Sequence, residues 1–455
     1  MNENELNSTS YNRRDFIRGG SMATMMALMG GVDLFAQTNA AAPGGAPKPG
    51  IKVKVAVIGL GAWGRDILKT LVRLPIAEVV AICDKYAPSV KKASADAPAA
   101  EQVEDYKKIL ENKEIKAVVI STPTHLHKDL VIEALKAGKH VYCEAPMANT
   151  VEDARAIAAA AKDAPHLAFQ PGLQLRSDPQ RHFLVPFIRS GALGPWVMAR
   201  AQSNKKQAWR TSSPKPEREK ELNWRLESEF SLGLVGELGC QQLDQAAWFL
   251  NAKPRAVEGS GNLCVWKDDG RDVADTVQAT IHYSNGVFLT YSATLGNSFD
   301  GDYEVFYGRD SAVMLRGSNA WLFKEVDSPL LGWEVYTKKE TFYKETGIVL
   351  KAGASKSADQ GASGIPEEPF TNTPLSYALG NFLRNAFDIA TAADDFKSSF
   401  GDDDKEALKD HLMKVRRQPA AGYQEGLLAT ITAIKAAEAV RTRKRVEIPA
   451  ELFTV

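Results

Sequence analysis

The chain of 455 residues has little cysteine and no excess of charge of either sign. Its four cysteines are widely spaced and form no CxxC pair, so neither a disulfide framework nor a metal site is predicted. Basic and acidic residues are equally numerous, 56 of each. Without a basic excess the chain is not expected to bind nucleic acid or an anionic membrane surface, and a neutral small-molecule substrate is favoured.

The N-terminus has no apolar run long enough for a membrane span. Residues 12–18, NRRDFIR, are typical of a twin-arginine export signal, and a mildly apolar, glycine-containing stretch follows to about Phe35. Ala40-Ala41-Ala42 fits a cleavage pattern. We therefore expect residues 1–50 to be a signal peptide and linker, and the protein to be periplasmic. The alternative is a disordered tail that happens to contain two arginines.

A dinucleotide-binding signature follows this segment. The apolar run Val53–Ile58 predicts a buried strand, which leads into GLGAWG at 59–64 and an amphipathic helix. The glycines allow a tight turn, close approach of a pyrophosphate and close helix–strand packing, and the helix N-terminus offers free N–H groups. Asp84, at the end of the next strand, can bind ribose hydroxyls and would repel a 2′-phosphate. The pattern predicts NAD rather than NADP, held by Gly59, Gly61, Ala62, Trp63, Gly64 and Asp84.

The distribution of apolar residues predicts an α/β chain with two folded parts. Strand and helix patterns alternate through residues 51–172, which is typical of a parallel Rossmann sheet. Over 173–350 short runs alternate apolar and polar residues, which predicts an α+β domain with an open, mostly antiparallel sheet. We expect a flexible loop at 351–370 and, over 371–455, helices that pack back on the core.

Motifs along both parts resemble the Gfo/Idh/MocA oxidoreductase family, which includes glucose–fructose oxidoreductase and inositol dehydrogenase. They are GLGAWG at 59–64, STPTHLH at 121–127, AGKHVYCEAPMA at 137–148, RSGALG at 189–194 and GELGCQQLDQAAWFL at 236–250. The resemblance implies an NAD-dependent enzyme that acts on a sugar, polyol or glycoside and forms a homo-oligomer through its open sheet. It also adds cofactor contacts at Thr122, Pro123, His127, Glu144 and Ala145.

Two positions depart from the family pattern. Where the family has Glu-Lys-Pro, with a lysine that donates a proton, this chain has Ala145. Where the family has Gly-x-His-x-x-Asp, this chain has Gln241, although Asp244 is kept. A positioned acid or base commonly contributes ~10²–10⁴-fold in rate, so another group must replace these two if the chemistry is kept.

Candidates for that role lie on the loops at the carboxyl edge of the parallel sheet and in the second domain. The catalytic candidates are His125, His127, Asp244 and Gln241, with Lys205, Lys206 and Tyr283 as further replacements. Aromatic faces suit sugar C–H surfaces, and arginine binds hydroxyls. The residues expected to contact substrate are Gln174, Arg176, Trp209, Arg210 and Asp244. Alternatively, the tryptophans are core residues and the charged segment 211–225 is a solvated insertion.

Three functions remain open at this point. The first is net oxidation of a carbohydrate by NAD. The second is a redox-neutral glycosidase or lyase, in which the sugar is transiently oxidised, the glycosidic bond is eliminated and the cofactor is restored. The third is a non-catalytic protein that binds a sugar or the cofactor.

Overall fold

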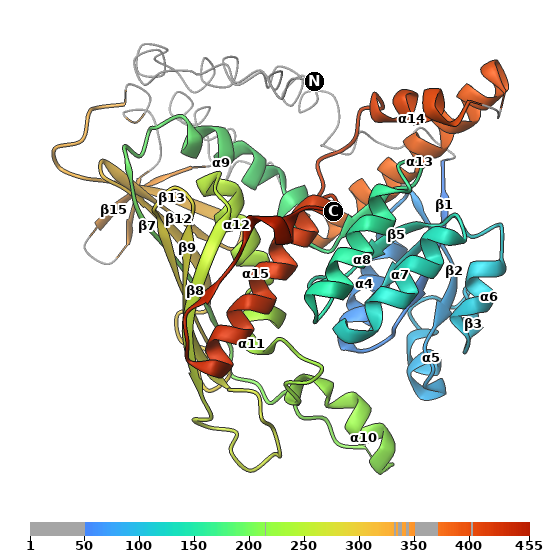
Figure 1. The fold of residues 1–455 in the computed structure, drawn as a ribbon, viewed down its shortest axis with the longest axis horizontal. Coiled ribbons are helices and arrows are strands. Elements are labelled where there is room, and N and C mark those ends of the chain that lie inside the picture. The colour runs from blue at the N-terminus through green and yellow to red at the C-terminus, as the bar shows by residue number, and fades with distance from the viewer. Residues whose placement is uncertain are drawn as a thin grey trace, which may run out of the picture.

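The structure is a computed structural model that describes residues 51–213, 215–331, 334, 339–342, 345–350, 372–401 and 404–455. The expected export signal at 1–50 and the expected loop at 351–370 lie outside the described residues. Two domains stand side by side, with the Rossmann domain on the right in Figure 1 and the second sheet on the left.

The first domain is a six-stranded parallel sheet, in the order β3-β2-β1-β4-β5-β6. Its strands are β1 (Val53–Ile58), β2 (Ala77–Cys83), β3 (Glu101–Val103), β4 (Ala117–Ile120), β5 (His140–Cys143) and β6 (Phe169–Pro171). The intervening helical segments are α4 (Ala62–Arg73), α5 (Ala87–Ala93), α6 (Tyr106–Glu111), η1 (Thr124–Leu126), α7 (His127–Lys136) and α8 (Val151–Lys162). The strand order confirms the predicted Rossmann fold, and it places the loops after β1, β4 and β5 at one edge.

The second domain is an open, mostly antiparallel sheet, as predicted, with the order β14-β15-β13-β12-β11-β7-β10-β9-β8-β16. Its one parallel pair among the described strands is β7 with β10. The strands are β7 (Trp196–Asn204), β8 (Pro254–Asn262), β9 (Thr276–Tyr283), β10 (Phe288–Thr294), β11 (Asp302–Gly308), β12 (Ser311–Arg316), β13 (Asn319–Lys324), β14 (Lys339–Phe342), β15 (Glu345–Val349) and β16 (Val446–Glu447).

Helices cover the face of this sheet that looks toward the Rossmann domain (Figure 1). They include α9 (Pro179–Arg189), α11 (Gly233–Glu237), α12 (Cys240–Leu250) and α15 (Tyr423–Thr442). In β11 the side chains alternate, so that Phe306 joins the main core whereas Tyr303 and Val305 form a small cluster on the other face.

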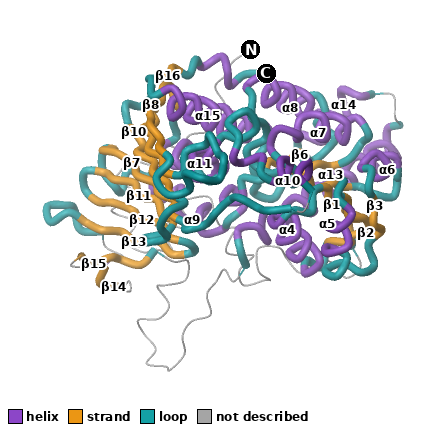
Figure 2. The backbone as a smooth tube through the Cα atoms, turned by 90° about the horizontal axis from the view of Figure 1, so that it is seen from below, coloured by secondary structure: helices purple, strands orange, loops and turns teal. Residues whose placement is uncertain are grey.

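The C-terminal helices connect the two domains. Leu379, Phe382 and Ile389 of α13 (Pro374–Phe400) are buried in the Rossmann core, and α14 (Lys405–Met413) packs on α13. Helix α15 contacts both β8 and α8, so it bridges the two sheets, and Figure 2 shows it between them. None of the described helices is long and apolar enough to cross a bilayer.

Candidate active site

The loop after β1 has the geometry of a pyrophosphate cradle. Gly59 has a φ of +95°, and a Cβ there would lie 2.7 Å from the backbone of Ser121. A Cβ at Gly64 would lie 2.0 Å from the Gly59 carbonyl oxygen, whereas a Cβ at Gly61 would meet nothing within 4 Å. Helix α4 begins after Gly61 with no side-chain cap and no acidic residue in its first turn. Its first N–H groups, at Ala62, Trp63 and Gly64, therefore face open space suited to a phosphate.

Asp84 stands beside this cradle at the end of β2. Its Oδ2 accepts a hydrogen bond from the Leu60 N–H at 2.9 Å, and its Oδ1 accepts one from the Tyr86 N–H at 2.8 Å. These bonds fix the carboxylate next to the glycine loop, and each oxygen keeps a lone pair for a ribose hydroxyl. The loop and Asp84 together fit the ribose and pyrophosphate of NAD.

Glu144 and Ala145 follow β5 at the same edge. Glu144 is buried, its Oε1 has no hydrogen-bond partner, and Gly172 packs against it, since a Cβ at Gly172 would lie 2.9 Å from its carboxyl carbon. Burial raises the pKa of Glu144 to about 7, and the facing Trp63 indole and Tyr142 hydroxyl offset part of that effect. Glu144 is thus a proton-carrying group beside the cofactor loop, one residue before the missing lysine.

His127 lies behind the site and holds two loops together. Its Nδ1 lies 3.1 Å from the Pro146 carbonyl oxygen, and its Nε2 lies 2.9 Å from the Thr122 carbonyl oxygen. Burial lowers the pKa of His127 to about 4, so the ring is neutral at pH 7 and donates to one of the two carbonyls. Both ring nitrogens are occupied by backbone, so His127 positions the loops after β4 and β5. Pro123, also after β4, precedes the short helix η1.

His125 lies on the other side of the same loop, half-buried against aromatic rings. Its ring centroid is 4.8 Å from that of Phe230 and 5.9 Å from that of Trp224, and its Nδ1 has no hydrogen-bond partner. Burial lowers the pKa of His125, and the nearby charge of Lys85 adds to the effect. Unlike His127, it has an unoccupied ring nitrogen.

Arg176 and Asp244 bind each other. The Arg176 Nε and Nη2 donate to the two carboxylate oxygens of Asp244, both at 2.8 Å, and Arg176 lies 4.7 Å from the centre of the Trp248 ring. Asp244 is 1% exposed, and burial raises its pKa while the Arg176 charge lowers it. The pair is a bidentate buried ion pair that fixes α12 against the short helix η2 (Gln174–Ser177).

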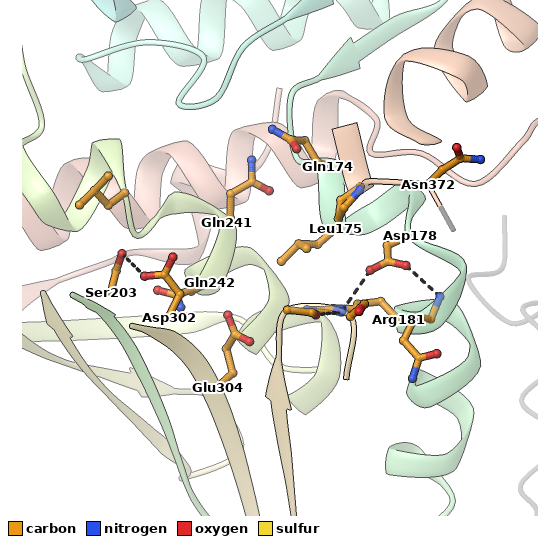
Figure 3. Close-up of a pocket in the computed structure, with 15 residues that line it drawn as sticks. Gln174, Leu175, Asp178, Arg181, Ser203, Gln241, Gln242, Asp302, Glu304 and Asn372 are labelled. Carbon is orange, nitrogen blue, oxygen red and sulfur yellow. Dashed lines mark hydrogen bonds and ion pairs between the residues drawn. The ribbon is translucent and has the colours of Figure 1, made fainter. Parts of the chain in front are cut away.

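Gln241 links the cofactor edge to a cavity in the second domain. Its Nε2 donates to the Gly172 carbonyl oxygen at 2.6 Å, and this is the glycine that packs on Glu144. Gln241 and Gln174 both line a cavity of about 380 Å³. In Figure 3 they lie on one side of it, with Asp302 and Glu304 of β11 on the other. A cavity with many polar lining residues therefore lies next to Gly172, which packs on Glu144 at the cofactor edge.

Residues 215–231 cross the cofactor edge as a strap, which includes α10 (Pro216–Leu222) and η3 (Trp224–Leu226). Glu221 pairs with Lys85 at 2.7 Å, and Arg218 lies 4.4 Å from the centre of the Tyr86 ring. The Asn149 amide donates to the Glu229 carbonyl oxygen at 3.0 Å. With the packing of Trp224 and Phe230 on His125, the strap contacts the loops after β2, β4 and β5.

The remaining expected substrate residues belong to the base of the strap. Arg210 pairs with Glu219 and donates to the Asp269 carbonyl oxygen at 2.7 Å. Trp209 is partly buried against the main core. Neither lines the cavity, whereas Gln174 does. Lys206 donates its N–H to Ser298 at the sheet end, and Tyr283 is fully buried.

Several polar residues near the site were not predicted from the sequence. Glu304 and Gln242 line the cavity, and Glu237 is a buried carboxyl whose pKa burial raises, 3.4 Å from the Thr124 hydroxyl. The signal in the sequence is a charged side chain at an inward position of an alternating strand, as in DYEVFYG at 302–308. No cluster of potential metal ligands occurs among the described residues.

Two family models match the chain. One, described as "Oxidoreductase family, NAD-binding Rossmann fold", covers residues 53–171, and a GFO/IDH/MocA C-terminal domain model covers residues 186–313. A levoglucosan dehydrogenase of Pseudarthrobacter phenanthrenivorans is 27% identical over 46% of this chain and 57% of its own length. An inositol 2-dehydrogenase of Arthrobacter sp. is 33% identical over 33% of this chain and 45% of its own length. The sequence matches thus span about half of these two relatives.

Solved structures match over a larger part of the chain. A levoglucosan dehydrogenase in complex with NADH superposes with a TM-score of 0.64 at 18% identity, covering 88% of this chain and 99% of that one. An aldose-aldose oxidoreductase from Caulobacter crescentus superposes with a TM-score of 0.59 at 19% identity, covering 87% and 100%. At these identities the likeness shows the fold.

The fold and the glycine loop define an NAD-binding Rossmann protein with a second, sheet-forming domain. The two family models together span more than half of the chain, and the chain belongs to the GFO/IDH/MocA oxidoreductase family.

Proposed function

We propose that this protein is an NAD-dependent oxidoreductase that acts on a sugar, polyol or glycoside. The observation that carries the proposal is the polar cavity, joined to the cofactor edge through Gln241, Gly172 and Glu144. Relatives that are named as dehydrogenases of levoglucosan and inositol support the choice of a polyhydroxylated substrate.

Oxidation of an alcohol requires removal of a hydride and of the hydroxyl proton. Bound NAD supplies the hydride acceptor, held by the glycine loop and Asp84. Ala145 cannot take the proton, Gln241 is committed to Gly172, and Asp244 is committed to Arg176. Glu144, His125 and Tyr283 are expected site residues that combine a titratable group with an unpartnered atom, but Tyr283 is fully buried in the second sheet, where burial raises its pKa. We propose Glu144 as the proton acceptor and His125 as the alternative.

The test is a spectroscopic assay on the protein with its bound cofactor. The absorbance band of reduced nicotinamide is followed while a panel of sugars, polyols and glycosides is added. We expect a rise with at least one compound, a rise that is lost in Glu144→Gln and kept in His125→Asn. A rise that is kept in Glu144→Gln and lost in His125→Asn would assign the proton to His125. No rise with any compound, together with binding of one of them, would reduce the protein to a sugar-binding role.

A redox-neutral glycosidase or lyase is the second candidate, and the strap favours it. The strap contacts three loops of the cofactor edge, so a bound dinucleotide would leave only after the strap opens. An enzyme that retains its cofactor needs a closed redox cycle. In such a cycle the sugar is oxidised to a ketone, the adjacent C–H becomes acidic and the glycosidic bond is eliminated. Water then adds to the product, and the hydride returns to the sugar.

The two candidates differ in what they require for turnover. A redox-neutral enzyme releases aglycone from a glycoside over many turnovers with no added acceptor. A net dehydrogenase stops after one turnover until NAD or another acceptor is supplied. Measuring aglycone release and reduced cofactor in the same sample separates them.

We also propose export and self-association. The twin-arginine pattern at 12–18 favours a periplasmic protein that is exported already folded around its cofactor. Cell fractionation of the native chain and of an Arg13→Lys, Arg14→Lys variant tests this.

The cluster on the outward face of the second sheet, with Arg200 and Arg316 over Tyr303, supports a homo-oligomer, which sedimentation tests.

A further inference from the structure

The cavity of Figure 3 is lined by many hydrogen-bond acceptors and by more carboxyl groups than cations. Asp178, Asp302 and Glu304 line it, and Arg181 is the single cation among its described lining residues. Arg181 is already matched, because its Nη1 lies 3.1 Å from Asp178 and also donates to the Gly317 carbonyl oxygen at 2.7 Å.

Two carboxylates remain without a matching cation. Asp302 accepts a hydrogen bond from the Ser203 hydroxyl at 2.8 Å, and neither Asp302 nor Glu304 forms an ion pair with a described residue. Glu304 is buried, and burial raises its pKa although the Arg181 charge lowers it. An anion that enters the cavity would meet the Asp302 carboxylate, and its charge would further oppose ionisation of the buried Glu304, so a negative ligand is disfavoured there.

Two buried amide oxygens also lack donors. The Gln242 Nε2 donates to the Gln202 carbonyl oxygen at 2.9 Å, which leaves its Oε1 as the free end, and that atom has no partner. Gln241 is fixed in the same way by Gly172, and its Oε1 has no partner either. Gln242 is 6% exposed and its side chain hydrogen-bonds Glu304, so the donor that its oxygen needs comes either from a protonated Glu304 or from an O–H or N–H of a ligand.

We propose that this cavity is the substrate-selecting site, and that Asp302 and Glu304 make it accept uncharged and amino sugars and reject sugar acids. Hydroxyl and ammonium groups donate to the free amide oxygens and to the carboxylates, whereas a carboxylate on the sugar offers only acceptors. The inference rests on the proposed function, since it names the class of carbohydrate that the oxidoreductase takes.

Binding of matched sugars to the protein with its bound NAD tests the inference by calorimetry. Each set contains a neutral hexose, its 2-amino sugar and its uronic acid, in the gluco, galacto and manno series. We expect the neutral and amino sugars of at least one series to bind, and the uronic acid to bind roughly 10- to 100-fold more weakly. In Asp302→Asn, Glu304→Gln the penalty on the uronic acid should fall to a few-fold.

The matched control is Asp410→Asn, an exposed charge on α14, which should leave the ratio unchanged. Equal or tighter binding of the uronic acid, an unchanged ratio in the double variant, or binding of no neutral or amino sugar would overturn the inference. The reduced-nicotinamide band in the same samples reports the proposed function separately. Charge-selective binding without reduction of the cofactor would contradict the proposed oxidoreductase function and support the inference about selectivity. Reduction of the cofactor without charge selectivity would support the function and contradict the inference.

Discussion

Replacing Glu144 by glutamine should stabilise the protein above neutral pH and have little effect in acid. The carboxyl is buried, and burial raises its pKa from 4.5 to about 7. The folded protein binds the Glu144 proton more tightly than the unfolded chain does. The loss of folding free energy caused by ionising buried Glu144 is therefore absent below about pH 4.5 and complete above about pH 7. Each pKa unit corresponds to about 1.4 kcal/mol, so the full penalty is about 3 kcal/mol. Glutamine is never ionised and avoids it.

Urea unfolding of the cofactor-free protein, followed by tryptophan fluorescence at pH 5 and pH 8.5, measures this difference. The variant should exceed the native protein by about 3 kcal/mol at pH 8.5 and by about 0.8 kcal/mol at pH 5. Glu104→Gln, at an exposed carboxyl, is the control and should show no such pH dependence. A gain of equal size at both pH values, or a loss at pH 8.5, would refute the assignment of a raised pKa to the buried Glu144.

Three further results follow from the site. Asp244→Asn should lower the free energy of unfolding by about 3 kcal/mol in urea titrations, since it leaves the Arg176 charge without its buried partner. Lys85→Ala, Arg218→Ala should speed NAD dissociation in stopped-flow measurements by roughly 5- to 20-fold at low salt, because the ion pair and the cation–π contact that join the strap to the loop after β2 are lost. Gly61→Ala should weaken NAD in equilibrium titrations while the unfolding midpoint stays nearly constant, because a methyl group there points into open space.

Much of the parallel sheet could be predicted because its elements are marked at both ends in the sequence. The strand Val53–Ile58 ends at Gly59, and the helix Val151–Lys162 begins at Thr150, whose hydroxyl accepts from the Asp153 N–H. The edge strand β3 has two exposed residues out of three and no apolar run, so only its pairing with β2 defines it.

Element ends without local markers were harder to predict. Within the helical region expected over 371–455, α13 continues to Phe400, because no breaker occurs until Gly401, which has a φ of +83°. The motif at 236–250 is split between α11 and α12. At the joint, Gly239 lies against the Tyr291 ring, a contact between residues far apart in sequence.

The sequence predicts candidate site residues, but the contacts that limit their roles involve distant partners. The motif at 121–127 gives no sign that both nitrogens of His127 are taken by backbone carbonyls, one of them at Pro146. The bond between Asp244 and Arg176 joins positions 68 residues apart. Such commitments decide which groups remain free to move a proton, and they are set by the tertiary fold.

The most direct test of the account is hydride transfer from a sugar to the bound cofactor. The protein with its bound NAD is incubated with sugars that carry deuterium on their ring carbons, and the released cofactor is analysed by mass spectrometry. The account predicts deuterium in the nicotinamide ring for at least one sugar that binds, with loss of transfer in Glu144→Gln. Tight binding of a labelled sugar with no deuterium in the cofactor would contradict it, and would leave a protein that binds carbohydrate without oxidising it.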